Sequence, residues 1–143
     1  MILNKEWISK MKQKRNTLQK GIVFDVFHEM HNHPSAGMVY EEVAKKHPEI
    51  SKATVYRILA DAAEEGKVLR LKLTEADDRY DVTLGRHFHV VCRKCGAVAD
   101  VESDFDTENI LRDTAGCENF CVEDFHIEFK GVCEKCRVPQ GQN

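Results

Sequence analysis

The sequence predicts an α+β fold with two domains, and three patterns support this prediction. The first half carries amphipathic helical stretches followed by a β-hairpin, and the second half alternates short strands with one helix. Two C-x2-C cysteine pairs also lie in the second half. We therefore expect a winged helix-turn-helix DNA-binding domain at residues 1–84 and a small α/β dimerisation domain with a four-cysteine zinc site at residues 85–143.

The first thirty residues predict two helices. Residues 5–15 carry apolar side chains at helical spacing among five basic ones, which indicates a short amphipathic helix with a cationic face. Thr17 is expected to cap a second helix that runs to about Met30. The apolar stripe of this second helix is formed by Ile22, Val23, Val26, Phe27 and Met30.

Residues 33–66 predict a helix-turn-helix. Pro34 excludes αR geometry at His33, and Ser35 can cap a helix that runs to about Lys46. Ser51 can cap the next helix, and Gly66 marks its C-terminal exit. Its apolar face is expected to comprise Ala53, Val55, Ile58, Leu59 and Ala62. As a recognition helix, it would present its N-terminal end to the major groove of DNA through Lys52, Thr54, Tyr56 and Arg57.

Strands and a hairpin complete the two domains. Residues 67–73 and 79–84 read as the two strands of the wing. The second half predicts strands at 87–92, 97–102 and 121–133, and a helix at 107–114. In the last strand Phe125, Ile127 and Phe129 alternate with polar residues, so one side should be buried and the other polar. Such a small sheet leaves an unpaired edge and an apolar face, which formation of a homodimer would cover.

The cysteine spacing predicts a structural zinc site. Cys92 and Cys95 form one pair, Cys133 and Cys136 form the other, and thirty-seven residues separate them. A two-residue gap lets both sulfurs of a pair reach one ion, and two pairs supply the four soft ligands of tetrahedral Zn2+. The long separation implies a small domain inserted between the pairs. Two unrelated thiol pairs, or disulfides, are the alternatives.

Histidine and aspartate side chains, which are harder metal ligands than thiolates, flank the first cysteine pair. His87 and His89 alternate with Phe88, so in a strand both imidazoles point to the same face. Asp100 follows at the end of an apolar stretch. Because four thiolates complete a tetrahedral zinc site, these three side chains cannot join it. They indicate a separate site of nitrogen and oxygen ligands.

Composition limits the partners and the compartment. The net charge is −3, but residues 1–85 hold 14 basic against 13 acidic side chains and residues 86–143 hold 7 against 11, so a polyanion should prefer the first half. No apolar run approaches a membrane span and no signal-like segment opens the chain. We therefore expect a cytoplasmic protein without a membrane partner. Thiols stay reduced in that compartment, which favours zinc over disulfides and leaves Cys117 and Cys121 as free thiols.

Six motifs follow one another along the chain. They are Arg15-x-Thr17-x-Gln19-Lys20, His33-Pro34-Ser35-Ala36, Ala53-Thr54-Val55-Tyr56-Arg57, Arg79-Tyr80-Asp81, His87-x-His89-x2-Cys92-x2-Cys95-Gly96 and Gly131-Val132-Cys133-x2-Cys136. In this order they resemble the ferric uptake regulator family of metal-dependent bacterial repressors, over essentially the whole chain.

The resemblance implies two metal sites. The four paired cysteines would hold structural zinc, and the regulatory site would comprise His33, Asp81, His87, His89 and Asp100. Three imidazoles and two carboxylates suit a five- or six-coordinate Fe2+ or Mn2+ better than tetrahedral Zn2+. The resemblance also implies a homodimer that binds a near-palindromic double-stranded DNA operator, and a regulator rather than an enzyme.

Two aspartates favour one branch of the family. Where iron-uptake repressors typically carry glutamates, this chain has Asp81 and Asp100, which resembles the peroxide-responsive branch. In that branch bound Fe2+ reacts with hydrogen peroxide and ligand histidines are oxidised; the matching positions are His33 and His87. Arg86 and Phe88 stand where iron-uptake repressors often have a further histidine and an acidic ligand, so a third metal site is not expected.

Three other readings remain open from the sequence. The first is a repressor that responds to iron or another divalent metal without sensing peroxide. The second is a non-haem metalloenzyme, since two histidines and a carboxylate also serve iron oxygenases. The third is a zinc-stapled interaction module. A helix-turn-helix argues against the enzyme, which would require a substrate pocket and an open coordination position.

Overall fold

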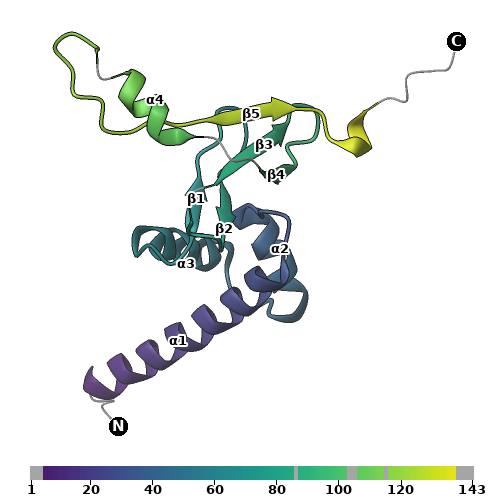
Figure 1. The fold of residues 1–143 in the computed structure, drawn as a ribbon. Coiled ribbons are helices and arrows are strands. Elements are labelled where there is room, and N and C mark those ends of the chain that lie inside the picture. The colour runs from purple at the N-terminus through teal and green to yellow at the C-terminus, as the bar shows by residue number, and fades with distance from the viewer. Residues whose placement is uncertain (1–4, 86, 103–105, 115, 138–143) are drawn as a thin grey trace, which may run out of the picture. The chain divides into compact units, whose positions relative to one another are not determined.

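The computed structural model describes residues 5–85, 87–102, 106–114 and 116–137. The chain divides into two compact units, unit 1 at Met1–Gly85 and unit 2 at Arg86–Asn143. Figure 1 labels their helices and strands. Unit 1 contains α1 (Lys5–Glu29), α2 (Ala36–Lys46), α3 (Lys52–Glu64), β1 (Leu69–Leu71) and β2 (Arg79–Asp81). None of the described helices combines the length and the apolar character that crossing a membrane requires.

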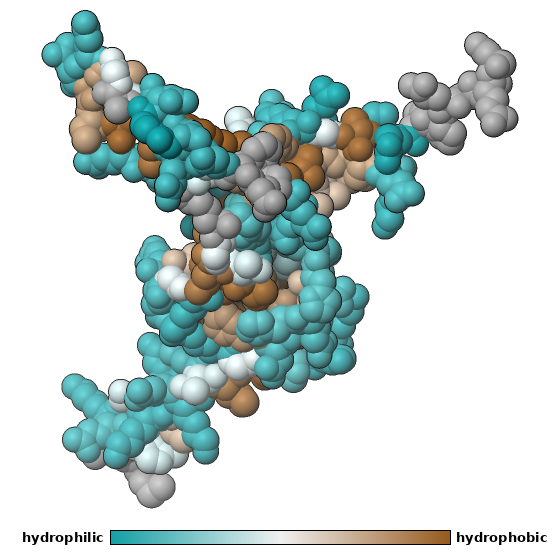
Figure 2. All heavy atoms as spheres, viewed as in Figure 1, coloured by the Kyte–Doolittle hydropathy of each residue, from teal (hydrophilic) through white to brown (hydrophobic). Residues whose placement is uncertain are grey.

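Helix α1 is continuous, so the prediction of two helices at residues 5–30 was wrong. Thr17 does not cap a new helix. Its hydroxyl donates to the carbonyl of Gln13, one turn earlier, at 3.0 Å. Nothing between the two expected helices is a glycine or a proline, so the backbone has no reason to break there. Hydrophilic residues cover most of the projecting N-terminal half in Figure 2, and Trp7 and Met11 are each about half exposed.

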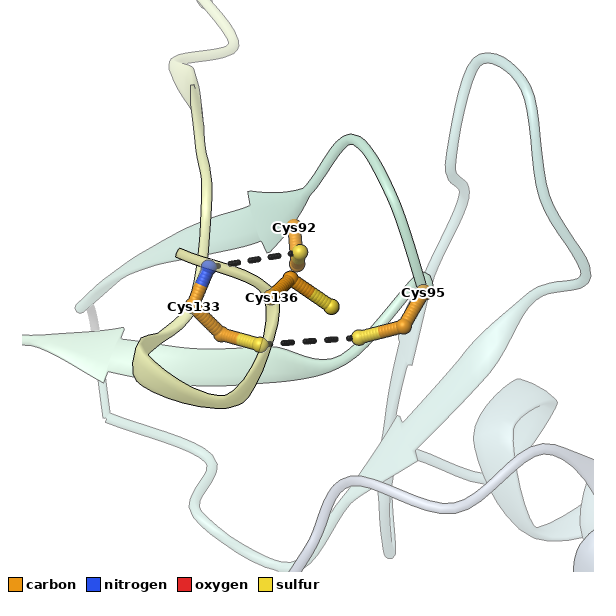
Figure 3. Close-up of side chains that lie close together, drawn as sticks. All are labelled: Cys92, Cys95, Cys133 and Cys136. Carbon is orange, nitrogen blue, oxygen red and sulfur yellow. Dashed lines mark hydrogen bonds between the residues drawn. The ribbon is translucent and has the colours of Figure 1, made fainter. Parts of the chain in front are cut away.

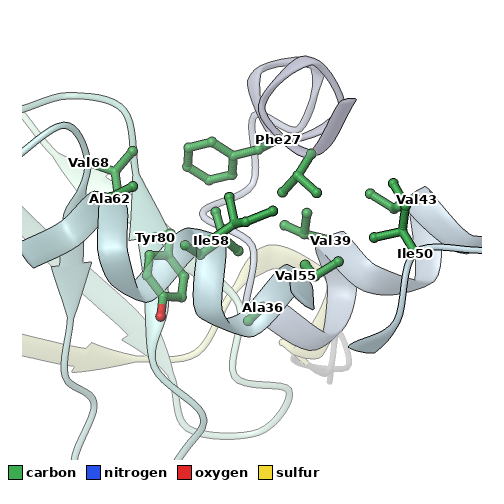
Figure 4. Packing of buried hydrophobic residues seen from close by; sticks show 12 residues of the cluster. Phe27, Ala36, Val39, Val43, Ile50, Val55, Ile58, Ala62, Val68 and Tyr80 are labelled. Carbon is green, nitrogen blue, oxygen red and sulfur yellow. The ribbon is translucent and has the colours of Figure 1, made fainter. Parts of the chain in front are cut away.

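The core of unit 1 lies where the three helices meet (Figure 4). Phe27 comes from α1, Val39 from α2 and Leu59 from α3, and each is at most 1% exposed. The cluster comprises Val23, Phe27, Ala36, Val39, Val43, Ile50, Val55, Ile58, Leu59, Ala62, Val68 and Tyr80. Burial of this apolar area is the main stabilising term, at roughly 25 cal/mol per Å2.

The helix boundaries of the helix-turn-helix follow the expected caps. Ser35 Oγ accepts from the N–H of Met38, and Ser51 Oγ accepts from the N–H of Thr54, both at 3.2 Å. Gly66 leaves α3 with φ of 70°, a conformation that glycine adopts without strain. Ala53 is exposed rather than part of the buried face, because helical periodicity places it on the side of α3 opposite Val55, Ile58, Leu59 and Ala62.

The wing is shorter than expected. Strands β1 and β2 pair antiparallel over three residues each, with Leu69 opposite Asp81 and Leu71 opposite Arg79. The predicted strands of seven and six residues were too long. Pairing stops at Leu71 because the connection that follows is a loop rather than a two-residue turn. Arg70 Nε donates to Asp78 Oδ2 at 2.7 Å and ties the start of that loop to its end.

The described residues of unit 2 form a three-stranded sheet in the order β4-β3-β5, and one helix lies between β4 and β5 in the chain. Its elements are β3 (Phe88–Cys92), β4 (Val98–Val101), α4 (Thr107–Asp113), β5 (Glu128–Gly131) and the 3-10 turn η1 (Glu134–Cys136). Strand β3 pairs antiparallel with β4 and parallel with β5. The strand predicted at residues 121–133 was too long. Among the described strands β5 pairs with β3 alone, and this pairing begins where Glu128 lies opposite His89.

Candidate metal centres

The four paired cysteines converge in unit 2 (Figure 3). Cys92 ends β3, and Gly96, with φ of 73°, turns the chain back so that the N–H of Cys92 donates to the carbonyl of Ala97 at 2.8 Å. Cys133 precedes η1, whose tight turn brings in Cys136. The N–H of Arg93 donates to the carbonyl of Gly131 at 2.8 Å, which joins the two cysteine loops.

Distances within the cysteine cluster fit tetrahedral zinc. The four sulfurs lie within 4.8 Å of one another, and Sγ of Cys95 is 3.6 Å from Sγ of Cys133. A tetrahedron with Zn–S bonds of about 2.3 Å has sulfurs about 3.8 Å apart. The cysteines are free thiols rather than disulfides, as expected. The predicted structural zinc therefore has a matching set of donors.

The electrostatics of the cluster suit a cation. The backbone N–H of Cys133 donates to Sγ of Cys92 at 3.3 Å. This donation, together with those of the backbone N–H groups of Cys95 and Lys94, lowers the pKa of Cys92 to about 6. Hydrogen bonds with the side chains of Cys133 and Cys95 raise the pKa of Cys136 to about 12. Without a cation, four thiols this close cannot all ionise, whereas a dication favours the thiolate form of each.

A second group of donors in unit 2 comprises two histidines around one carboxylate. Asp100 lies directly opposite His89 in the pairing of β3 with β4. Oδ1 of Asp100 is 3.3 Å from Nε2 of His89 and 3.3 Å from Nε2 of His87. The two imidazole rings are 4.4 Å apart, so they share one face, as their alternation with Phe88 predicted. Both imidazoles are at most 17% exposed, whereas Asp100 is 49% exposed.

Unit 1 carries a separate pair of donors. Nε2 of His33 lies 3.3 Å from Oδ2 of Asp81, and both side chains are nearly buried. An isolated bridge between Ser35 and Arg79 brings the segments together, and the N–H of Tyr80 donates to the carbonyl of Pro34 at 2.9 Å. His33 has φ of 49° and so avoids αR geometry, as Pro34 requires.

Arg79 is a residue of this region that sequence reasoning did not single out for a role. Its Nη1 donates to the carbonyl of His33 at 3.1 Å, 46 positions away in the chain. The other oxygen of Asp81, Oδ1, accepts from the N–H of Thr83 at 2.8 Å. These contacts fix the backbone around the pair. The only sequence signal was the place of Arg79 next to Tyr80 and Asp81 in one motif.

The predicted DNA-binding residues lie on the first two turns of α3. Tyr56 is 42% exposed, and Nζ of Lys52 lies 5.6 Å from the centre of its ring. Arg57 is exposed and pairs with Asp61 at 3.4 Å. Thr54 is half-buried and its hydroxyl lies 2.9 Å from that of Ser51, so its side chain takes part in the cap. Three of the four residues therefore face solvent.

Two other expectations concern residues outside these centres. Cys117 and Cys121 are exposed free thiols, as predicted, and within the described ranges neither belongs to a metal-competent group. The expectation that a third metal site is absent involved Phe88 and Arg86. Arg86 lies outside the described residues. The ring of Phe88 packs against Phe129 at 6.3 Å between centroids, on the face of the sheet opposite His89.

Two curated relatives of this chain are peroxide-responsive repressors. One, the Peroxide-responsive repressor PerR of Staphylococcus epidermidis, is 28% identical over 123 residues, which cover 86% of this chain and 81% of that protein. PerR of Staphylococcus aureus is also 28% identical over 123 residues, covering 86% of this chain and 82% of that protein.

Solved structures and a family model agree with these relatives. The Campylobacter jejuni peroxide stress regulator is 26% identical, with a TM-score of 0.69, and the match covers 94% of this chain and 100% of that one. The Helicobacter pylori ferric uptake regulator Fur has a TM-score of 0.71 at 20% identity, covering 92% and 91%, which supports the fold alone. The model of the Ferric uptake regulator family matches residues 11–130. Because that match spans most of the sequence, this chain belongs to the ferric uptake regulator family.

Proposed function

We propose that this protein is a metal-dependent transcriptional repressor that senses hydrogen peroxide. Membership of the ferric uptake regulator family supports the coarser function, a metal-responsive repressor. The observation that carries the proposal is the arrangement around Asp100, where one carboxylate oxygen is shared by the Nε2 atoms of His87 and His89. Such a group attracts a dication, and its hard oxygen and nitrogen donors suit Fe2+ or Mn2+.

The regulatory ion would draw ligands from both units. Unit 1 offers His33 and Asp81, and unit 2 offers His87, His89 and Asp100. We assign these five side chains to one Fe2+ or Mn2+ ion, and Cys92, Cys95, Cys133 and Cys136 to structural Zn2+. An ion held by donors from both units would restrict their relative motion. Metal binding would then increase the population that is competent to bind DNA.

Peroxide sensing is the finer part of the proposal. Fe2+ held by these ligands would catalyse cleavage of the O–O bond of hydrogen peroxide, with the histidine ring as the net two-electron reductant. His33 and His87 are the proposed targets because they occupy the positions that the resemblance to the peroxide-responsive branch implies. Each also lies 3.3 Å from a carboxylate of the proposed site. In net terms, a ring carbon of one histidine gains an oxygen atom and the peroxide is reduced to water. The modified ring is a poorer ligand, so the ion is released and the protein leaves DNA. The similarity to peroxide-responsive repressors supports this assignment.

DNA recognition would use α3 of each protomer in a homodimer. Lys52, Tyr56 and Arg57 are exposed at the N-terminal end of this helix, with Thr54 beside them. Two recognition helices related by a two-fold axis would read a near-palindromic operator in successive major grooves. We propose that the protein acts in the cytoplasm as a regulator and not as an enzyme.

Operator binding under defined metal loading tests the proposal. A duplex selected from a random library by the Mn2+-loaded protein serves as the operator. The Fe2+-loaded and Mn2+-loaded proteins should both bind it, and mild peroxide should release only the Fe2+-loaded one. Metal content is measured on the same samples, and peptide mass spectrometry should find one added oxygen on His33 or His87 after peroxide.

The other outcomes assign the protein differently. Operator binding that depends on metal, with unmodified histidines after peroxide, identifies a repressor that responds to iron or another divalent metal. Failure to select any duplex under any metal identifies a zinc-stapled interaction module. Turnover of a substrate in the absence of DNA would identify an enzyme.

A further inference from the structure

Three polar side chains form one row across the sheet of unit 2. In the pairing of β3 with β4, Asp100 is the partner of His89. In the pairing of β3 with β5, Glu128 is the partner of His89 on the other side. Directly paired residues of neighbouring strands point to the same face of a sheet. The imidazole of His89 therefore stands between two carboxylates.

Packing on the opposite face supports this orientation. Phe88 and Phe129 are the neighbours of His89 and Glu128 along their strands, and their rings meet edge to face at 6.3 Å. Since side chains alternate along a strand, contact between these two aromatic rings turns His89 and Glu128 to the other face together. Glu128 therefore belongs to the face that carries the metal-competent histidines.

The carboxylate of Glu128 is nearly buried and incompletely satisfied. Its side chain is 12% exposed, and Oε2 is buried and has no hydrogen-bond partner among the residues that the structure describes. The other oxygen, Oε1, lies 3.8 Å from Nζ of Lys130, which is 42% exposed. A buried carboxylate oxygen without a donor is destabilising, because it has lost its hydrogen bonds to water. This energetic cost marks Glu128 as a group that gains a partner in another state of the protein.

We propose that Glu128 is a positioning residue of the regulatory metal site, an inference that rests on the function proposed above. Nε2 of His89 faces Asp100 and is the nitrogen that would bind the ion. The carboxylate of Glu128 accepts a hydrogen bond from Nδ1–H of the same ring once the ion is bound. This bond fixes the tautomer with Nε2 available and increases the electron density that His89 donates.

Glu128→Gln is the test variant because it keeps the shape of the side chain and removes its charge. Removing the carboxylate that orients a metal-bound histidine typically lowers metal affinity 10- to 100-fold. Titration of the zinc-loaded dimer with Mn2+ should therefore give an affinity about tenfold weaker or more. The visible spectrum of the Co2+-loaded protein should also shift, because the ligand field of His89 changes. Glu123→Gln, the same change at an exposed position of the segment before β5, should leave both measurements unchanged.

A double-mutant cycle with His89→Ala tests whether Glu128 acts through His89. In the His89→Ala background, Glu128→Gln should cause no further loss of Mn2+ affinity. An equal loss in both backgrounds would overturn the positioning role, and so would wild-type affinity with a wild-type Co2+ spectrum for Glu128→Gln. If His89→Ala alone binds Mn2+ as tightly as wild type, the assignment of His89 to the regulatory site is wrong. This outcome would contradict the proposed function, whereas the two preceding outcomes contradict only the role of Glu128.

Discussion

Oδ1 of Asp100 lies 3.3 Å from Nε2 of His89, its direct partner across β3 and β4. The same oxygen lies 3.3 Å from Nε2 of His87. One carboxylate atom therefore orients two imidazoles, and the antiparallel pairing of two strands fixes its position. The sequence separates Asp100 from these histidines by a cysteine pair and a turn, so the contact depends on strand register rather than on proximity in the chain.

Replacing Asp100 by asparagine should weaken the regulatory metal site and leave the zinc site unchanged. The variant removes the negative charge shared by His87 and His89 and keeps the size of the side chain. We expect Mn2+ affinity to fall at least about tenfold, since the lost negative charge attracts the dication directly. The zinc content should stay at the wild-type value because Asp100 does not belong to the cysteine cluster. Metal analysis and Mn2+ titration check both parts, and unchanged Mn2+ affinity would contradict the assigned ligand role.

The helices of unit 1 could be predicted because their signals are local. Ser35 and Ser51 cap α2 and α3, and Gly66 ends α3, as their residue types indicated. The continuity of α1 was missed because Thr17 has two uses, as a cap and as a donor to the preceding turn. Its contact with Gln13 decides for the second use, and the sequence alone does not distinguish them.

The extent of the strands in unit 2 could not be predicted from alternation alone. Residues 121–133 alternate like a strand, but only Glu128–Gly131 has a partner in β3. Pairing decides where a strand begins, and pairing depends on register. For the same reason the sequence could not predict a role for Glu128. It is predicted only as a polar residue on the polar side of the strand until the pairing with His89 is known. The cysteine cluster, in contrast, could be predicted from spacing alone. Two C-x2-C pairs supply the four ligands of one zinc ion, and binding the same ion brings the two pairs together.

Lengthening the two aspartates should change the response to peroxide more than the response to metal. Asp81→Glu and Asp100→Glu keep the charge of each ligand but move its oxygen by one methylene group. We expect the double variant to bind the operator with Fe2+ and with Mn2+, and to accumulate less oxygen on His33 and His87. Peptide mass spectrometry after a fixed peroxide exposure measures the difference. Equal oxidation of the variant and wild type would show that the choice of aspartate does not govern the chemistry.

Loss of one zinc ligand should destabilise unit 2. Cys95→Ser removes one of four thiolates and leaves Cys92, Cys133 and Cys136 without a complete tetrahedron. Structural zinc contributes folding free energy directly, so this small unit should lose its cooperative unfolding transition together with its zinc. Calorimetry and zinc analysis on the same sample test this outcome. Cys117→Ser is the matched control, since this exposed thiol lies outside the cluster and should retain zinc and the transition.

Gly37→Ala should weaken DNA binding without damaging the fold. A Cβ at Gly37 would lie 3.2 Å from the hydroxyl oxygen of Tyr56, closer than an ordinary contact, so the tyrosine must move. Gly37 lies in the first turn of α2, where alanine is the better helix former by up to about 1 kcal/mol. Stability should therefore hold or rise, while operator affinity falls by up to about 1 kcal/mol as the hydroxyl of Tyr56 shifts by a few tenths of an ångström.

Two comparisons identify the cause of that loss. Gly21→Ala, in α1, adds a Cβ with no atom within 4 Å, so it should raise helix stability and leave operator affinity unchanged. Tyr56→Phe removes the hydroxyl that meets the new methyl group, so Gly37→Ala should cost less affinity in that background. Fluorescence anisotropy with the selected duplex and thermal unfolding of the same samples measure the two quantities. If Gly37→Ala binds DNA as wild type does, the position of Tyr56 against α2 has no part in recognition. The contacts of α3 with DNA would then have to come from Lys52 and Arg57.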